Sequence, residues 1–231
     1  MARTPAEDPG DAEGEGGPFD GDRVAAVCGA VATLAALGGI ALGVLLDPTF
    51  SWTTDALSDL GVRDESAVAF NWGLIGGGAA GVCYAAALGF GGARSRGGSG
   101  AIGRAGEGIR AFLLALAMVA MAGVGVFDLT EPLHGPAAIG FYGLITAVFT
   151  VDGWLRRATA TGRVALAFAP VHVAVWATFV AGWWPVTGLA LPELPGALML
   201  AAWVWVVGPR PVAAAVRGGS DPEAGGPTDG D

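Results

Sequence analysis

Residues 67–90 read AVAFNWGLIGGGAAGVCYAAALGF, an apolar stretch without a single charged side chain. At a rise of about 1.5 Å per residue, a helix of this length crosses a hydrocarbon layer of roughly 30 Å. Five more apolar runs of similar length occur in the chain, which predicts an all-α fold, a polytopic transmembrane bundle of six helices. The predicted spans are 24–46, 67–90, 109–127, 136–155, 164–184 and 188–207.

The sixth predicted span is less regular at its start than the others. It opens with GLALPELPG (188–196), which contains two prolines and Glu193, and only 196–207 is cleanly apolar. Because proline has no N–H to donate within a helix, we expect this first turn to be irregular and to lie at the membrane interface.

The composition supports a membrane protein with charged ends. The 231-residue chain is 53% hydrophobic and 14% charged, whereas soluble domains are usually about one-quarter charged. Residues 1–23 hold seven carboxylates and two arginines, and residues 209–231 hold four carboxylates and two arginines. Such acidic, Gly- and Pro-rich segments bury too little apolar surface to fold, so both tails are predicted to be disordered. The acidic balance and the lack of a basic stripe argue against nucleic acid as a partner.

The arginines predict the orientation in the membrane. If the N-terminus is cytoplasmic, eleven of the twelve arginines fall on the cytoplasmic side and only Arg63 lies outside. Basic residues concentrate on the cytoplasmic side of membrane proteins, so we expect a cell-membrane protein with both termini in the cytoplasm. All basic residues are arginine, which together with the acidic tails fits adaptation to a salt-rich (halophilic) cytoplasm; a GC-rich genome would give the same bias.

Small residues recur at every fourth position of the second span and form a stripe. Close backbone approach through such stripes is a main source of helix association in lipid. The sequence predicts that this stripe packs against another helix, of the same chain, of a second copy or of another membrane protein. Its members are Gly73, Gly77, Gly81, Ala85 and Gly89.

Polar side chains inside the spans are the first candidates for function, because they are costly in hydrocarbon. His172 lies near the middle of the fifth span, where it is either functional or a neutral imidazole hydrogen-bonded inside the bundle, near the carbonyl freed by Pro170. Asp152 precedes Arg156 by one turn, so we expect a local ion pair rather than a proton relay. Asn71 lies in the first turn of the second span.

The loop between the first two spans contains FSWTTDALSDLG (50–61). On a helical wheel its acidic and apolar side chains separate, which predicts a short amphipathic helix lying on the membrane surface. We expect Trp52 to anchor it at the headgroup level, Asp59 to pair with Arg63, and Gly61 to end it in a left-handed turn.

The outer loops together form an anionic rim. Two of its members share a D-x-T pattern: Asp47 follows the first span in GVLLDPT and Asp128 follows the third in GVGVFDLT. Eight carboxylates face one arginine and one histidine, His134, which we expect to bond a loop carboxylate. The eight are Asp47, Asp55, Asp59, Asp64, Glu65, Asp128, Glu131 and Glu193.

Four segments carry a resemblance to a known family: ALSDLG (56–61), FNWGLIGGG (70–78), GVFDLTEPLHGPAAIGF (125–141) and LPELPGALMLAAWVWV (191–206). Their succession resembles family 998 of the domains of unknown function, small six-span membrane proteins frequent in salt-loving archaea. The S-D-x-G loop also resembles, more faintly, the Frag/DRAM-type six-span proteins. Neither group brings an established activity, so the resemblance implies the architecture and singles out Asp59, Asn71, Asp128 and His134 as positions to test.

Three functions remain open at this point. The first is a non-catalytic bundle whose outer rim interacts with lipid, cations or another membrane protein, and it needs no cofactor. The second is a membrane-embedded hydrolase or transferase acting on lipid, with Asp59, Asp128, His134 and Ser58 as catalytic candidates. A metal at Asp47, Asp128, Glu131 and His134 would serve such an enzyme, although one histidine among carboxylates is a poor zinc site. The third is a transporter.

Overall fold

The computed structural model describes residues 21–94 and 101–218, which are mostly helical, with no strand among them. The six long helices are α1 (Gly21–Leu46), α2 (Ala67–Arg94), α3 (Ala101–Val126), α4 (His134–Leu155), α5 (Ala160–Val180) and α6 (Ala190–Ala202). Three short segments complete the chain: the 3-10 helix η1 (Leu57–Gly61), the π-helical segment η2 (Trp203–Val207) and α7 (Val212–Gly218).

The fold class predicted from the sequence is confirmed. Six helical stretches are long and apolar enough to cross a membrane. The third begins earlier than predicted, at Gly103, and the fifth ends earlier, at Val180. The sixth runs from Ala190 into α7.

Two parts of the tail prediction are wrong where the structure describes the chain. Residues 21–23 are the first turn of α1, and residues 212–218 form α7, so neither stretch is a disordered tail. The helix α7 packs against α1, where Val212 is buried. The remaining tail residues, 1–20 and 219–231, lie outside the described residues.

The irregularity expected at the start of the sixth span occurs at its other end. Helix α6 begins regularly at Ala190, and Pro192 fits there because the first helical turn needs no N–H donor. The chain widens into the π-helical segment only at Trp203, and Gly208 then adopts an extended backbone that ends it.

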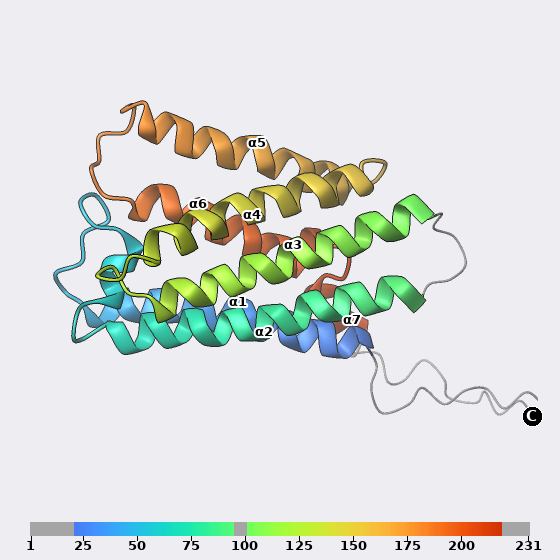
Figure 1. Cartoon of the computed structure of the whole chain (residues 1–231), viewed down its shortest axis with the longest axis horizontal. Coiled ribbons are helices and arrows are strands. Elements are labelled where there is room, and N and C mark those ends of the chain that lie inside the picture. Colours follow the sequence, from blue (N-terminus) through green and yellow to red (C-terminus); the bar gives the residue numbers. More distant parts are fainter. Residues whose placement is uncertain (1–20, 95–100, 219–231) are drawn as a thin grey trace, which may run out of the picture.

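The helices run antiparallel in sequence order, so their connections gather at two ends (Figure 1). We call the end with the connections 47–66, 127–133 and 181–189 the loop end; it is on the left in Figure 1. We call the opposite end, where α1 begins and α4 turns into α5, the arginine end. Each of α1 to α5 packs on the next, and the chain returns through α6 and η2 to α1.

The first half of the small-residue stripe brings α2 against α1. A Cβ atom at Gly73 would lie 2.7 Å from the Cα of Gly39 and 2.8 Å from the carbonyl oxygen of Ala35. At Gly77 a Cβ atom would lie 2.8 Å from the carbonyl oxygen of Ala32. The two backbones therefore touch, and only glycine permits this separation.

The second half of the stripe faces inward as well. Gly81 lies against the side chain of Met118 and Gly89 against Ala111, both on α3, while Ala85 is buried. The stripe is thus occupied by neighbours in the same chain. It is not available for association with a second copy or another protein, which corrects that alternative.

Replacement of Gly73 by alanine should destabilise the bundle, because the added methyl group meets backbone atoms that cannot rotate away. We expect a loss of about 1–3 kcal/mol, measured as a lower unfolding temperature in detergent. Gly76→Ala on the same helix is the matched control, because nothing lies within 4 Å of a Cβ atom there. It should be neutral or stabilising by up to about 1 kcal/mol. Equal effects of the two substitutions would contradict the backbone contact.

Candidate functional site

The loop end is held together by an ion-paired triad. The guanidinium of Arg63 donates to Asp47 Oδ2 at 2.6 Å and to Asp55 Oδ2 at 2.8 Å. Arg63 and Thr49 together lower the pKa of Asp47 from its usual 3.8 to about 2. The expected pair between Asp59 and Arg63 is wrong: Asp59 Oδ2 instead accepts from the backbone N–H of Ala56 at 2.7 Å. The i,i+4 proximity exists only within a continuous α-helix, and η1 ends before Arg63.

The loop containing η1 is inserted into the bundle rather than lying on the membrane surface. Leu57, Ser58 and Leu60 are buried, and Gly61 is not in a left-handed conformation. The predicted surface helix is therefore wrong. Its apolar residues Leu57 and Leu60 are buried within the bundle. Asn71 Nδ2 donates to the carbonyl oxygen of Gly61 at 2.9 Å and so joins the end of η1 to α2.

Backbone hydrogen bonds also join this loop to the connection between α5 and α6. The carbonyl oxygen of Thr53 accepts from the N–H groups of Thr187 and Gly188, and that of Asp55 accepts from Ala190, each at 2.9 Å. The loop is thereby fixed over the first turn of α6.

The two D-x-T motifs form the same turn. Asp47 Oδ1 accepts from the N–H and hydroxyl of Thr49 at 2.9 and 2.6 Å, and Asp128 Oδ1 accepts from those of Thr130 at 2.8 and 2.6 Å. The donors of Thr130 lower the pKa of Asp128. Asp128 thus ends α3 as Asp47 ends α1.

The prediction that His134 bonds a loop carboxylate is wrong. Its Nδ1 lies 2.7 Å from the carbonyl oxygen of Phe127, not from a carboxylate. Since a carbonyl oxygen only accepts, Nδ1 carries the proton and donates. The imidazole is therefore held by the backbone that leaves α3.

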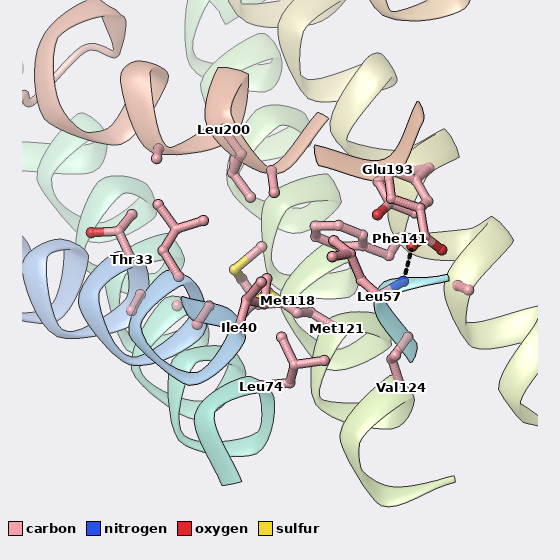
Figure 2. A pocket seen from close by; sticks show the side chains of 18 of the residues that line it. Thr33, Ile40, Leu57, Leu74, Met118, Met121, Val124, Phe141, Glu193 and Leu200 are labelled. Carbon is pink, nitrogen blue, oxygen red and sulfur yellow. Dashed lines mark hydrogen bonds between the residues drawn. The ribbon is translucent and has the colours of Figure 1, made fainter. Parts of the chain in front are cut away.

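A cavity of about 80 Å³ lies below the loop end, between α1, α2, α3, α4 and α6. Figure 2 shows its walls, which are mainly aliphatic and thioether side chains such as Ile40, Leu74, Met118 and Leu200. A water-sized group occupies roughly 10–15 Å³ of such a cavity, so there is room for about five to eight of them. That is the size of a short alkyl chain.

Polar side chains line the cavity from the loop end. They are Ser58 from η1, His134 and Tyr142 from α4, and Glu193 from α6. Glu193 is only 7% exposed, and its Oε2 accepts from the backbone N–H of Leu57 at 2.7 Å, the dashed line in Figure 2. Thr33 and Tyr84 also line the cavity, but their hydroxyl groups donate to the backbone carbonyls of Gly29 and Arg210. The rest of the wall is mainly apolar.

The structure brings together only some of the residues singled out from the sequence. Ser58 and His134 both line the cavity, but Asp59, Asn71 and Asp128 are not on its wall. The weak metal candidates Asp47, Asp128, Glu131 and His134 do not converge: among residues 21–94 and 101–218 no three His, Cys, Asp or Glu side chains could hold a metal ion.

The sequence did not predict that Glu193 lines a cavity, and Tyr142 was not considered. Glu193 counted only as a member of the rim. The available signal was a carboxylate in LPELPG at the start of an apolar span, since carboxylates within spans are rare unless they have a role.

Residues 30–209 match the model of a protein family described as a protein of unknown function, DUF998. The chain belongs to the DUF998 family. No curated protein and no solved structure matches it. The match begins within α1 and ends after η2, so it leaves out the tails, α7 and the first turns of α1, close to the range that the resemblance in the sequence implied.

His172 of this DUF998 protein is buried, and its hydrogen bonds define the tautomer of the ring. Its Nε2 lies 3.1 Å from Nε1 of Trp176, which can only donate, so Nε2 accepts. The proton of the neutral ring is then on Nδ1, which donates to the hydroxyl oxygen of Thr146 at 2.8 Å. That hydroxyl in turn donates to the carbonyl oxygen of Tyr142. These partners satisfy the ring without the carbonyl freed by Pro170.

Asp152 closes the arginine end of the bundle. It forms the expected ion pair with Arg156, and it also accepts from Arg110 Nη1 at 3.1 Å and from Trp203 Nε1 at 2.8 Å. Arg156 continues to the carbonyl oxygen of Val207 at 2.8 Å. One fully buried carboxylate thus joins α3, α4 and η2.

Asp152→Asn should destabilise the bundle strongly, because it leaves Arg110 and Arg156 with a neutral partner at a buried position. We expect a loss of about 3–5 kcal/mol, the usual cost of removing one member of a buried ion pair. Thermal unfolding in detergent measures it. Asp64→Asn, which changes an exposed carboxylate, is the control and should have little effect. An equal change in unfolding temperature for both variants would contradict a stabilising role of the ion pairs at Asp152.

Proposed function

We propose that this protein is a non-catalytic membrane protein that binds one small amphiphile, or one apolar chain, in the cavity between α1, α3 and α6. The observation that carries the proposal is the cavity itself, with aliphatic walls and four polar side chains at one end. Ligand sites of this kind combine an apolar lining with a few polar groups that orient the ligand.

The loop end faces the outside of the cell membrane in this proposal. Arg63 is the one described arginine at the loop end, and the other described arginines belong to the opposite half of the bundle. The positive-inside tendency then places the arginine end and both termini in the cytoplasm, and the anionic rim outside.

Single cysteines test this orientation. In a background with Cys28→Ser and Cys83→Ser, we compare Asp64→Cys at the loop end with Ala158→Cys at the arginine end, both exposed positions. A membrane-impermeant maleimide on intact cells should label the Asp64→Cys variant at once and the Ala158→Cys variant only after lysis. The reverse pattern would contradict the orientation.

The geometry gives less support to the two alternatives. A hydrolase would need a base bonded to the Ser58 hydroxyl, yet within the described part of the chain no hydrogen bond joins Ser58 Oγ to His134, and Asp59 and Asp128 are engaged in turns. A transporter would need a path across the bundle, yet Asp152 and its two arginines join the helices at the arginine end. Binding requires neither feature.

Filling the cavity should abolish ligand binding while leaving the fold intact. A hexyl probe bearing a diazirine, irradiated with the protein in nanodiscs, should label residues of the cavity wall such as Met118 and Leu200. Ala197→Leu adds three carbon atoms at the cavity wall and should reduce this labelling several-fold. Mass spectrometry of the peptides measures it.

Ala177→Leu is the matched control for that experiment, because Ala177 lies on the exposed face of α5. It should leave labelling of the cavity wall unchanged. Labelling spread evenly over lipid-facing residues, or unaffected by Ala197→Leu, would contradict the proposed function.

A further inference from the structure

The polar end of the cavity has more hydrogen-bonding capacity than the protein uses. A carboxylate can accept about four hydrogen bonds. Among the described residues, the N–H of Leu57 is the one donor on Glu193. The hydroxyl groups of Ser58 and Tyr142 take part in no hydrogen bond with the described part of the chain, and both residues line the same cavity. These groups converge on a space large enough for a ligand.

The carboxyl group of Glu193 also has no cationic partner among the described residues. No arginine or histidine within residues 21–94 and 101–218 forms a salt bridge with Glu193, and the charged side chain acting on it is another carboxylate, Asp59. Arg63 is engaged by Asp47 and Asp55. A buried carboxylate without a cation is unfavourable, and a second carboxylate nearby increases that cost.

We propose that the ligand is a single-chain amphiphile with a protonated primary amine as its head. The ammonium group binds Glu193, with the hydroxyls of Ser58 and Tyr142 as further acceptors, and the alkyl chain runs inward between Ile40, Met118 and Leu200. This inference deepens the proposed function and rests on it.

Size and charge distribution support this class of ligand. The cavity holds about five to eight methylene-sized groups, which suits one short chain and not a whole two-chain lipid. The exposed or half-exposed carboxylates around the loop end, such as Asp59, Asp64 and Glu65, raise the local concentration of cations. An ammonium ion has three donors and therefore matches a site made of acceptors.

The test is competition against the hexyl diazirine probe with the full chain in phosphatidylcholine nanodiscs. The competitors are hexylammonium, hexanol and N-acetylhexylamine, with concentrations corrected for partition into the bilayer. A hydrogen bond between charged groups is worth about 1.5–3 kcal/mol, so hexylammonium should compete at a roughly tenfold or more lower concentration than the two neutral compounds.

Glu193→Gln is the decisive variant, because glutamine keeps an acceptor for the N–H of Leu57 and removes the charge. In this variant, the ratio between the concentrations at which the neutral compounds and hexylammonium compete should fall to about one. Asp128→Asn is the matched control: it removes a rim charge outside the cavity wall, can keep its turn to Thr130, and should retain the full preference.

The outcomes separate this inference from the proposed function. If hexanol competes as well as hexylammonium in the wild type, amphiphile binding stands and the ammonium head is wrong. A preference for the amine that persists in Glu193→Gln would also overturn the assignment to Glu193. If no competitor reduces labelling of the cavity wall, the proposed function fails too. Should Glu193→Gln not fold, the comparison of hexylammonium with N-acetylhexylamine in the wild type decides alone.

Discussion

A bilayer supplies no hydrogen bonds, so each polar group in the spans must find its partner within the protein. This constraint explains most of the polar contacts in the bundle. His172 has a donor on one nitrogen and an acceptor on the other, and Asp152 takes two arginines and a tryptophan N–H. Glu193 differs from both, because it is buried yet has one backbone donor and no cation among the described residues. At the candidate site a carboxyl group therefore keeps acceptor capacity that the described chain does not use.

Packing explains why a cavity exists beside such a residue. Glycines draw α1 and α2 into backbone contact, and α3 follows closely on α2. Helix α6 contacts η1, α4 and α5, whereas it is the following π-helical segment that packs against α1. The start of the sixth span is therefore held away from α1 by the inserted loop, and its end returns to α1 through Val204 and Trp205. The space between these two contacts is the cavity, and the widened turn of η2 aims Trp203 at Asp152.

The sequence predicted those features that depend on local composition. Runs of apolar residues are sufficient to indicate spans, and a glycine every fourth residue indicates close packing, although not the partner. Asp152 and Arg156 are one turn apart in the same helix, so their ion pair could be predicted from the spacing in the sequence. The contact of Arg110 with Asp152 crosses from α3 to α4, and that of Glu193 with Leu57 joins residues from opposite ends of the chain. No periodicity encodes such contacts. The prediction for the loop 47–66 failed for a related reason. Its amphipathic pattern fits a helix on the membrane surface and a segment between helix ends equally well. Only the position of α6 decides between them.

The most direct test of this account is a high-resolution density map of the protein in lipid nanodiscs. The account predicts an elongated density not belonging to the chain, bounded by Ile40 and Leu200 and ending at the carboxylate of Glu193 beside the N–H of Leu57. A map in which α6 has closed onto α1, so that Met118 and Leu200 fill the space, would contradict it. So would a map in which an arginine of the chain neutralises Glu193.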